Sequence, residues 1–543
     1  MKLDCYYEIE RLTKKLVSIK SVNKAQDAET NIANYIYGYL FGIDYFKDHS
    51  QQVLKVKTND DVLTRHSIVA YIKGKSNKTI ILTSHTDTVD TKDYGSIEDY
   101  AYMPDELPNK LKQLFNLSSE VSHDIDSDEY LFGRGALDMK SGLASHLYIM
   151  KYFANHPDEL NGNLVFVSEC DEEDGSLGII SCLDVLNELK NKENFEYVAC
   201  LNTDFHTPIN GDDTPIVHLG TIGKLLPCFA VFGKVAHVGK AFDSFDPNLL
   251  LSEITKRMTL NMDLVDKAGK HTTIPPISLK QTDLKDSYSV QTAISAFGYY
   301  NYLIYNSSPK TVMEKCKQIA TDSFNETIDY LNSEYKKYCD LNECDFSKLP
   351  WTSKVYSYTE WYEMLKNQNP QFDFEMNQYI EQLNNENPQM DLRMFGYEIV
   401  KKSYEYYKEK DPVVVIFYGS MFYSPIECKD ETLIKAVNSS IKKVNEDSKF
   451  KTETELYYPY ISDMSFLSTN FDEETIKDML ANSPQHGYKY VYPYEKIKAI
   501  NVPVVNIGVY GKDGHMFTER VNKEYSFKNV PNITYETIIE LLK

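Results

Sequence analysis

The stretch "NLVFVSECDEEDGS" (Asn163–Ser176) joins an apolar run to four consecutive acids, Asp171 to Asp174. Its "LVFV" segment has the β-branched and aromatic residues that are typical of a strand buried inside a sheet. Four acids in a row would suit a solvated turn, but a solvated turn gives no reason for acids directly after so apolar a strand. We therefore interpret this stretch as a buried strand of an α/β sheet that ends in a functional site.

Four further segments place His or Asp where an apolar strand ends or where a glycine-rich loop precedes a helix. They are "TIILTSHTDTV" (79–89) with His85 and Asp87, "GRGALDMKSG" (133–142) with Asp138, "YVACLNTDFH" (197–206) with Asp204, and "VPVVNIGVYGKDGH" (502–515) with His515. In open α/β sheets, sites form beyond the carboxyl ends of the strands. We expect these side chains to converge with the acids of residues 171–174 on one edge of the sheet.

Helix-like and strand-like segments alternate from the N-terminus to about residue 215 and again after residue 427. This alternation indicates an α/β sheet with helices packed on its faces. The intervening part has a different texture: a strand at 224–234, a helix at 247–258, a strand pair at 293–306, a long helical section at 311–410 and a strand at 412–422. The sequence thus predicts a catalytic α/β domain in two parts, residues 1–218 and 428–543, interrupted by an α+β domain at 219–427.

The bulk properties exclude several classes of partner. The 543-residue chain carries a formal net charge of -22, which argues against binding to nucleic acid or to an anionic membrane. The N-terminal segment lacks the apolar core of a signal peptide, and the nine cysteines are scattered without CxxC pairs, which is typical of reduced thiols. We expect a cytoplasmic protein; the net charge says little about a small substrate, since one local cluster can oppose the global sign.

The mixture of candidate ligands has a chemical meaning. Histidines with carboxylates, and without thiolates, suit zinc, cobalt or manganese rather than calcium. One carboxylate between two ions about 3.5–4 Å apart is the two-metal arrangement of many hydrolases, which activates water and polarises a carbonyl group. A separate carboxylate must then take the proton of the water and pass it to the leaving nitrogen.

Each candidate also has a simpler explanation or a rival. Asp138 could cap the helix that begins near Ser141, and His206 competes with Asp204 as a ligand. Glu172 and Glu173 could exchange roles, and the residues alone do not decide between them. Glu519, in "GHMFTE" (514–519), is expected to be a partner of the site rather than a ligand.

An ordered set of motifs, "SHTDTV", "GRGALDMKSG", "DEEDGS", "NTD", "GKVAHVG" and "GHMFTE", extends from residue 85 to residue 519. In this order they resemble the aminoacylase and carboxypeptidase-G-type dinuclear metallohydrolases of peptidase family M20. The segments "GTIGKLLP" (220–227) and "GVYGKDGHMFTERVNK" (508–523) are most similar to the branch of arginine-utilisation (arginine-degradation) proteins. The resemblance implies a mixed-sheet, zinc-exopeptidase-like catalytic domain with an inserted lid or dimerisation domain.

The resemblance also implies a set of two divalent cations, most readily zinc, with cobalt or manganese as alternatives. Its metal ligands, carried over onto this sequence, are Asp138 as the shared ligand, His85 and Asp204 for one ion, and Glu173 and His515 for the other. A cis peptide bond is implied after Asp138, between Asp138 and Met139.

Three catalytic roles follow from the same resemblance. Glu172 matches the general base, and Asp87 would hydrogen-bond the imidazole of His85 and fix its tautomer. His237, in the inserted domain, matches a histidine that stabilises the oxyanion, often from the neighbouring subunit of a dimer. Removing one such donor typically costs about 2.7–4 kcal/mol of transition-state stabilisation.

The sequence departs from the family pattern in two places. Family members usually have an Arg three residues before a Pro that opens a helix, where it binds the carboxylate of the substrate. Here Asn306 precedes Pro309 at that spacing, so the means of recognising a free carboxylate is open. The inserted domain is also enlarged, which is compatible with either a monomer or a homodimer.

These features predict a metal-dependent hydrolase that cleaves the amide bond of a dipeptide or an N-acyl amino acid, with the resemblance pointing to arginine or ornithine catabolism. The alternative is a non-catalytic relative that binds an amino-acid derivative and regulates or scaffolds. The complete set of ligands and the base favour the enzyme, because a non-catalytic relative would be free to lose them.

Overall fold

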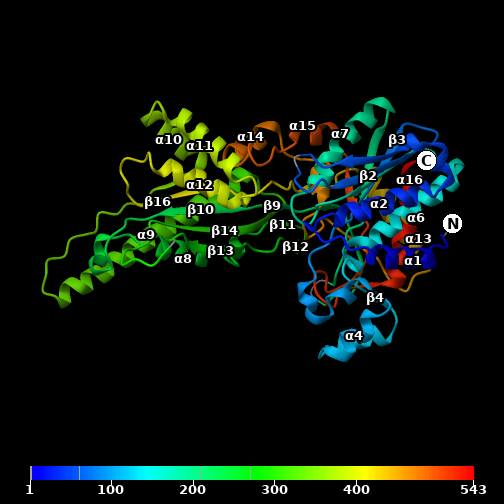
Figure 1. The fold of residues 1–543 in the computed structure, drawn as a ribbon, viewed down its shortest axis with the longest axis horizontal. Coiled ribbons are helices and arrows are strands. Elements are labelled where there is room, and N and C mark those ends of the chain that lie inside the picture. Colours follow the sequence, from blue (N-terminus) through cyan, green and yellow to red (C-terminus); the bar gives the residue numbers. More distant parts are fainter. Residues whose placement is uncertain (1–2, 60, 209–210, 270, 286) are drawn as a thin grey trace. The chain divides into compact units, whose positions relative to one another are not determined.

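An eight-stranded mixed sheet organises the first of two units in the computed structural model, which describes residues 3–59, 61–208, 211–269, 271–285 and 287–543. The first unit comprises Met1–Thr221, Ile426–Asn470 and Glu495–Lys543. The second comprises Ile222–Pro425 and Phe471–Tyr494. Figure 1 shows the helices and strands of both units.

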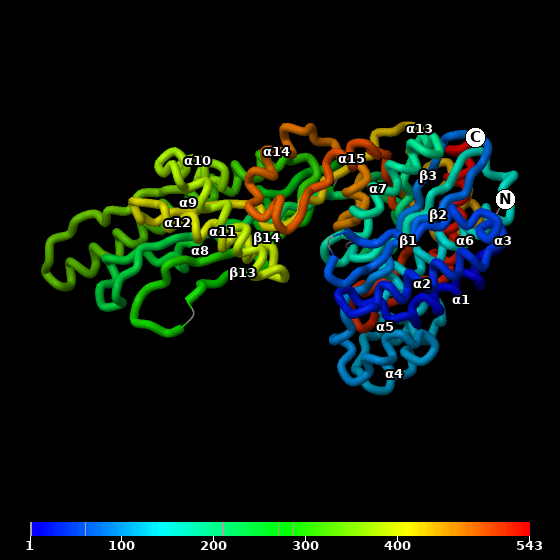
Figure 2. The backbone as a smooth tube through the Cα atoms, turned by 45° about the horizontal axis from the view of Figure 1, so that its top comes forward, coloured from blue at the N-terminus to red at the C-terminus, as the bar shows by residue number. Residues whose placement is uncertain are grey.

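The strands of the large sheet lie in the order β1 (Val53–Lys57), β2 (His66–Ile72), β5 (Asn163–Glu169), β3 (Lys78–His85), β6 (Glu196–Asn202), β19 (Val504–Asn506), β7 (Ile216–His218) and β18 (Glu453–Glu455). The antiparallel strands β1 and β2 lie side by side (Figure 2). At the centre, β3 runs parallel to both β5 and β6, and β19 runs parallel to β6. The predicted α/β architecture with a mixed sheet is confirmed.

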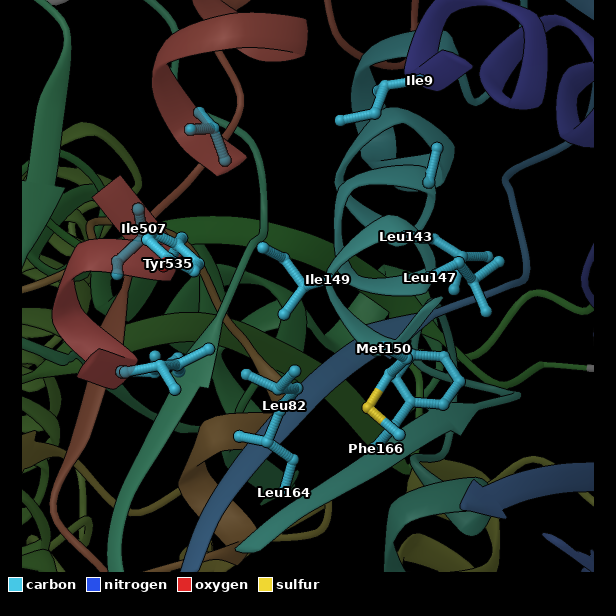
Figure 3. Packing of buried hydrophobic residues seen from close by; sticks show 14 of the residues in the cluster. Ile9, Leu82, Leu143, Leu147, Ile149, Met150, Leu164, Phe166, Ile507 and Tyr535 are labelled. Carbon is cyan, nitrogen blue, oxygen red and sulfur yellow. The ribbon is translucent and has the colours of Figure 1, made fainter. Parts of the chain in front are cut away.

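Helices cover both faces of this sheet. One face carries α1 (Tyr6–Val17), α2 (Ala28–Phe41), α6 (Ser141–Asn155), α13 (Glu431–Asn445) and α16 (Val530–Leu541), and the other carries α7 (Leu177–Lys192). Leu82, Leu164 and Phe166 from the strands and Leu143, Leu147 and Met150 from α6 belong to one buried hydrophobic cluster, part of which is shown in Figure 3. Because side chains alternate across a strand, the neighbouring valines of β5 point toward the α7 face, and the strand is buried throughout.

A second, three-stranded sheet in this unit joins distant segments: β4 (Tyr130–Phe132), β20 (Gly511–Lys512) and β21 (Arg520–Asn522). Strand β21 pairs with β4, and this places the loop after β4 beside the loop between β20 and β21. The remaining elements of the unit are α3 (Asp44–Asp48), α4 (Leu107–Leu114), α5 (Ser119–Asp126), α15 (Tyr494–Ile500), β8 (Gly220–Thr221) and β17 (Ile426–Glu427).

The second unit has a sheet with the order β13 (Ile277–Asp283), β14 (Ser295–Ile304), β10 (Pro227–Phe232), β16 (Val413–Tyr418) and β15 (Val355–Ser357), and β9 (Gly223–Leu225) pairs with β14. Helices α8 (Pro247–Met258) and α9 (Pro309–Leu341) pack together on one face. Helices α10 (Tyr358–Gln368), α11 (Phe372–Glu386) and α12 (Leu392–Tyr404) cover the other (Figure 1). Short strands β11 (Lys267–Ala268) and β12 (His271–Thr272) form a separate hairpin.

Local signals explain why α8 begins and ends where the sequence predicts. The Asp246 carboxylate caps the helix by accepting the amide of Asn248 at 2.9 Å, and Pro247 occupies the first turn, where no amide is needed. Lys256 and Arg257 lie in the last turn, where their positive charges interact favourably with the negative end of the helix dipole.

Two details differ from the sequence-based expectation. The segment 293–306 contains one strand, β14 (Ser295–Ile304), rather than a strand pair, because Gly298 continues the ladder on both sides, opposite Phe229 and Gln281. Residues 471–494, which the sequence assigned to the last part of the catalytic domain, lie in the second unit. There α14 (Glu473–Ala481) packs on α9, and the Gln485 side chain donates to the Tyr418 carbonyl at 2.7 Å.

Within the described ranges, no helix is both long and apolar enough to cross a membrane.

Candidate active site

The sheet brings three of the predicted segments to one edge. In the parallel ladder of β3 and β5, His85 lies opposite Glu169, and the acids of residues 171–174 follow directly. In the ladder of β3 and β6, Thr83 lies opposite Asn202, two residues before Asp204. Since parallel strands end at the same side of a sheet, His85, the acid turn and Asp204 share one edge, as the sequence predicts.

Asp138 lies between two imidazoles. Its Oδ1 atom is 2.9 Å from Nε2 of His85, and its Oδ2 atom is 2.7 Å from Nε2 of His515. The peptide bond between Asp138 and Met139 is cis, as the resemblance implies. Each carboxylate oxygen therefore faces a different histidine, which is the arrangement expected of a ligand shared by two ions.

Glu519 holds the loop that carries Asp138. Its Oε1 atom accepts the amides of Leu137 and Asp138 at 3.1 and 3.2 Å, and its Oε2 atom accepts Nη1 of Arg134 at 2.8 Å. The loop also depends on Gly135, which has φ of 77° and whose Cβ would lie 2.7 Å from the Thr88 side chain. Pairing of β21 with β4 brings Glu519 to this loop.

The start of α6 presses against the end of β6. A Cβ atom on Gly142 would lie 2.4 Å from the carbonyl oxygen of Thr203, so only glycine permits this approach. The close approach places the Asp138 loop next to Asp204, whose amide donates to the Asn506 side chain at 2.8 Å.

The predicted ligands form two groups that share one member. His85, Asp138 and Asp204 form the first group, and Asp138, Glu173 and His515 form the second; within each, the candidate ligand atoms lie within 4.8 Å of one another. These donors are imidazole nitrogens and carboxylate oxygens, the set that zinc, cobalt and manganese accept. The residues present therefore fit a pair of divalent cations around Asp138.

The electrostatic environment suits a positive charge between these side chains. Burial opposes ionisation of Asp138, but hydrogen bonds from His515 and His85 outweigh it and hold the pKa of this carboxyl well below its usual range. Burial alone would lower the pKa of the His515 imidazole, but the hydrogen bonds and charges of Asp138 and Glu173 outweigh burial and raise this pKa to about 11. In Asp204, burial and the Asp138 charge raise the pKa to about 7. Carboxylates thus surround each imidazole and favour a cation at this place.

The four acids of the turn point to four different places. Asp171 accepts Nη1 of Arg65 at 2.5 Å, Glu173 lies 3.1 Å from Nε2 of His515, and Asp174 pairs with Lys24 at 2.8 Å. Glu172 belongs to neither ligand group. Burial raises the pKa of the Glu172 carboxyl well above its ordinary value, which is common in carboxyls that exchange protons.

Asp87 contacts the acid turn more closely than it contacts His85. Its two carboxylate oxygens accept the amides of Glu172 at 3.1 Å and Glu173 at 3.0 Å. Nδ1 of His85 lies 3.1 Å from the backbone carbonyl of Asp87 and 3.6 Å from its carboxylate. The backbone carbonyl of Asp87 therefore orients the His85 ring, while the Asp87 side chain binds the amides of the acid turn.

Of the other sequence candidates, His206 and His237 lie outside both groups. Nε2 of His206 is 3.3 Å from the Thr214 carbonyl, and its ring packs 5.3 Å from that of His218. His237 belongs to the second unit, is exposed, and accepts the Gly239 amide at 3.0 Å. The Asn306 side chain donates to the Lys267 carbonyl at 2.5 Å and so supports its own loop.

Several buried or half-buried residues near these groups had no signal in the sequence: Asn23, Arg65, Tyr458 and Asp463. Tyr458 and Asp463 lie in the loop after β18, and their charges or dipoles affect Asp204 and Glu172 respectively. None of them belongs to a spacing pattern, so only the tertiary structure identifies them.

A cavity of about 450 Å³ opens beside the second ligand group. It is lined by Asn23, Lys24, Val89, Asp90, Asp93, Arg134, Glu173, Asp174 and His515. Because Glu173 and His515 are among its walls, a molecule in this cavity would reach the predicted metal centre.

Comparisons with known proteins agree with the motifs. The family model for peptidase family M20/M25/M40 matches residues 81–499. Two proteins of Bacillus subtilis are similar over nearly the whole chain: Protein RocB, 33% identical over 98% of this chain and 95% of its own, and the uncharacterized protein YqjN, 31% identical over 99% and 96%. An M20 family metallo-carboxypeptidase from Sulfolobus solfataricus shares the fold, with a TM-score of 0.52 at 14% identity, covering 98% of this chain and 99% of its own. The predicted family is confirmed.

Proposed function

Because the chain belongs to peptidase family M20/M25/M40, a family of metal-dependent hydrolases, we propose that it cleaves the amide bond of a dipeptide or an N-acyl amino acid. The single observation that carries the proposal is the position of the Asp138 carboxylate, which has one oxygen beside Nε2 of His85 and the other beside Nε2 of His515. A carboxylate that faces two imidazoles on opposite oxygens has the geometry of a ligand shared by two cations.

The ligand assignment follows from the two groups. His85 and Asp204 would hold one ion, Glu173 and His515 the other, and Asp138 both. Zinc is the cation we propose, with cobalt or manganese as alternatives, because the donor set suits all three. When bound, a metal pair activates a water molecule and polarises the carbonyl group of the substrate.

We assign the proton transfers to Glu172. Its carboxyl lies in the same turn as Glu173 but in neither ligand group, which leaves it able to take a proton from the attacking water. The same carboxyl then gives this proton to the leaving nitrogen, since one group in the correct place can act as base and then as acid. Glu173, at 3.1 Å from His515, is the better ligand of the two.

The residue that we consider for substrate recognition, His237, belongs to the second unit. We propose that His237 stabilises the oxyanion, because its imidazole is exposed and keeps Nε2 available while Nδ1 accepts the Gly239 amide. Asn306 is already bonded to the Lys267 carbonyl, so we assign no carboxylate-binding role to it. The resemblance to arginine-utilisation proteins leads us to propose dipeptides or N-acyl derivatives of arginine and ornithine first. Cytoplasmic localisation and the choice between monomer and homodimer stay predictions from the sequence.

The test combines Glu172→Ala with a substrate panel. Dipeptides and N-acyl amino acids, including those of arginine and ornithine, are incubated with wild type loaded with zinc, cobalt or manganese. We expect turnover of at least one member by wild type, and a loss of about 10²–10⁴-fold in kcat for the variant, as for other general bases. Metal content measured by elemental analysis should stay at two equivalents.

Two results would contradict the proposal. Full activity of Glu172→Ala would show that another group transfers the proton. Tight binding of panel members without product formation, with every metal, would favour a non-catalytic protein that binds an amino-acid derivative.

A further inference from the structure

The segment that carries Asn23 is paired with the loop that follows His85. The amide of Thr88 donates to the Ser21 carbonyl at 3.0 Å, and the amide of Asn23 donates to the Thr88 carbonyl at 2.9 Å. The Ser21 hydroxyl adds a bond of 2.7 Å to the carbonyl of Thr86. These backbone contacts fix Asn23 relative to the end of β3.

The side chain of Asn23 joins two buried carboxylates. Its Nδ2 atom donates to Oδ2 of Asp87 at 2.8 Å and to Oδ1 of Asp171 at 3.1 Å. Asp87 is 0% exposed and Asp171 is 1% exposed. Both carboxylates only accept hydrogen bonds when ionised, so the amide nitrogen, not the oxygen, must face them. A shared donor offsets part of the cost of burying two negative charges close together.

These two carboxylates hold opposite ends of the acid turn. Asp87 accepts the amides of Glu172 and Glu173. Asp171 closes the turn on itself, because its carbonyl accepts the Ser176 amide at 2.7 Å and its Oδ2 atom accepts the Leu177 amide at 3.2 Å. The backbone of the turn is thus fixed between two side chains that Asn23 connects.

We propose that Asn23 is a positioning residue, whose amide couples Asp87 to Asp171 and so sets the orientation of Glu172 and Glu173. The inference rests on the proposed function, since it takes Glu173 as a metal ligand and Glu172 as the group that moves the proton. Residues that orient metal ligands typically change metal affinity or activity about 10–100-fold when they are lost.

Arg65 also contacts Asp171, but its other partners are structural. Its guanidinium donates to Asp61 at 2.7 Å and to Glu29 at 3.2 Å; neither belongs to a ligand group, and Glu29 itself accepts the Asp171 amide at 2.8 Å. Asn23 differs because it contacts Asp87 as well, and because it is half-buried and lines the 450 Å³ cavity beside Glu173. Truncating Asn23 therefore enlarges an existing cavity and leaves the hydrophobic core intact, which makes it a clean test.

The experiment compares Asn23→Ala, Asn23→Asp and the control Asn31→Ala, whose side chain is exposed on α2. Zinc affinity is measured by competition with a chromophoric chelator, kcat and KM with the best panel substrate, and the thermal midpoint on the metal-free protein. For Asn23→Ala we expect zinc affinity and kcat each to fall about 10–100-fold, with KM close to wild type. The thermal midpoint should fall only modestly, because Arg65 and the amides of Glu172 and Glu173 still donate to the two carboxylates. Asn23→Asp should lose more, because it adds a third carboxylate beside two others. Asn31→Ala should match wild type throughout.

Two outcomes would overturn the inference. One is wild-type zinc affinity and kcat in Asn23→Ala. The other is a lowered thermal midpoint whose folded fraction accounts for the whole loss of activity, which would make the role merely structural. A wild-type protein that binds no zinc would instead overturn the proposed function, so the two failures are distinguishable.

Discussion

The two units differ in the kind of side chain that they bury. The first unit buries charged residues of both signs: Glu29, Arg65, Asp87, Asp124, Arg134, Asp138, Lys140, Glu169, Asp171, Asp204, Asp463, Glu519, Arg520, Lys523 and Glu536. Among the described residues of the second unit, the one charged side chain that is buried is Asp266. Removing a charge from water costs on the order of several kcal/mol per ion. The first unit therefore bears a cost that the second avoids.

The second unit buries aromatic rings with neutral hydrogen-bond partners instead. Nε1 of Trp361 donates to the Ser403 hydroxyl at 2.8 Å, and the hydroxyls of Tyr300 and Thr255 lie 2.7 Å apart. Such a core is stabilised by packing and by apolar burial. The comparison teaches that buried charge in this protein gathers in the unit that carries the proposed cation site, while the core of the second unit is mainly apolar and aromatic.

The largest effect should come from removing the shared carboxylate. Asp138→Asn replaces one of the two oxygens with an amide nitrogen, which cannot bind a cation, so the pair of metals loses its common ligand. We expect metal content to fall well below two equivalents. We expect kcat/KM to fall at least about a thousandfold, since a metal contributes several kcal/mol of charge stabilisation and each 1.4 kcal/mol is about tenfold. Elemental analysis and steady-state kinetics measure both.

The control for the change in net charge is Asp99→Asn. Asp99 is an exposed residue that pairs with Lys20 at 3.1 Å, and we expect its variant to keep wild-type metal content and activity. Two equivalents of metal and normal turnover in Asp138→Asn would contradict the assignment of the first unit as the cation-binding region.

A smaller effect, on stability, should come from Arg65→Met. Without the guanidinium, the buried carboxylates of Asp61, Asp171 and Glu29 lose their common positive partner. Breaking a buried ion pair from one side costs about 3–5 kcal/mol. Hydrogen–deuterium exchange of peptides from β2 and β5 in the metal-free protein should report faster opening by the corresponding factor.

Arg65→Lys is the matched control, since it keeps the charge but lacks the fork that reaches three carboxylates. Its exchange rates should lie between those of wild type and Arg65→Met. If Arg65→Met exchanges as slowly as wild type, the buried ion pairs of Arg65 do not stabilise the first unit. The difference in buried charge between the two units would then have no counterpart in stability.

Much of the fold could be predicted because its signals are local. The apolar runs of β3 and β5 and the cap and proline of α8 specify these elements without reference to the rest of the chain. The errors arose where a local signal was ambiguous. The strand pair expected at 293–306 is a single strand, because the sheet continues through Gly298, and residues 471–494 had no signal for the unit on which they pack.

The candidate site divides in the same way. His85, Asp138 and His515 could be found because each follows a strand or a glycine-rich loop and belongs to an ordered motif. Asn23 and Arg65 could not be found, since each is a single polar residue in an ordinary loop or turn. They reach the acid turn only because the chain folds their segments against it. The ligands and the partners that share their motifs, Asp87 and Glu519, leave a pattern in the sequence. Asn23 and Arg65 share no motif with the ligands, so only the three-dimensional structure identifies them.

The smallest effect should come from Asp266, the buried carboxylate of the second unit. Oδ2 of Asp266 accepts the amides of Tyr305, Asn306 and Ser307 at 2.7–2.9 Å, and Oδ1 accepts the Ser307 hydroxyl at 2.5 Å. Asp266→Asn turns one acceptor into a donor that faces other donors, so we expect a loss of about 1–3 kcal/mol. Both tryptophans, Trp351 and Trp361, lie in this unit, so denaturant unfolding followed by their fluorescence reports it.

The pH dependence of this loss separates the charge from the packing. Burial opposes ionisation of Asp266, but the Ser307, Tyr305 and Asn306 donors outweigh it and hold its pKa below the ordinary value. A depressed carboxyl pKa contributes stability that is complete above the unfolded pKa of about 4 and is lost as the pH falls through the folded pKa. The difference between wild type and Asp266→Asn should therefore be largest near neutral pH and shrink in acid. The exposed pair of Lys317 and Glu360 offers a control, since Lys317→Ala should change stability by no more than about 1 kcal/mol at any pH. A loss that stays constant down to acid pH would mean that the shape of the side chain, not its charge, explains why this unit buries Asp266.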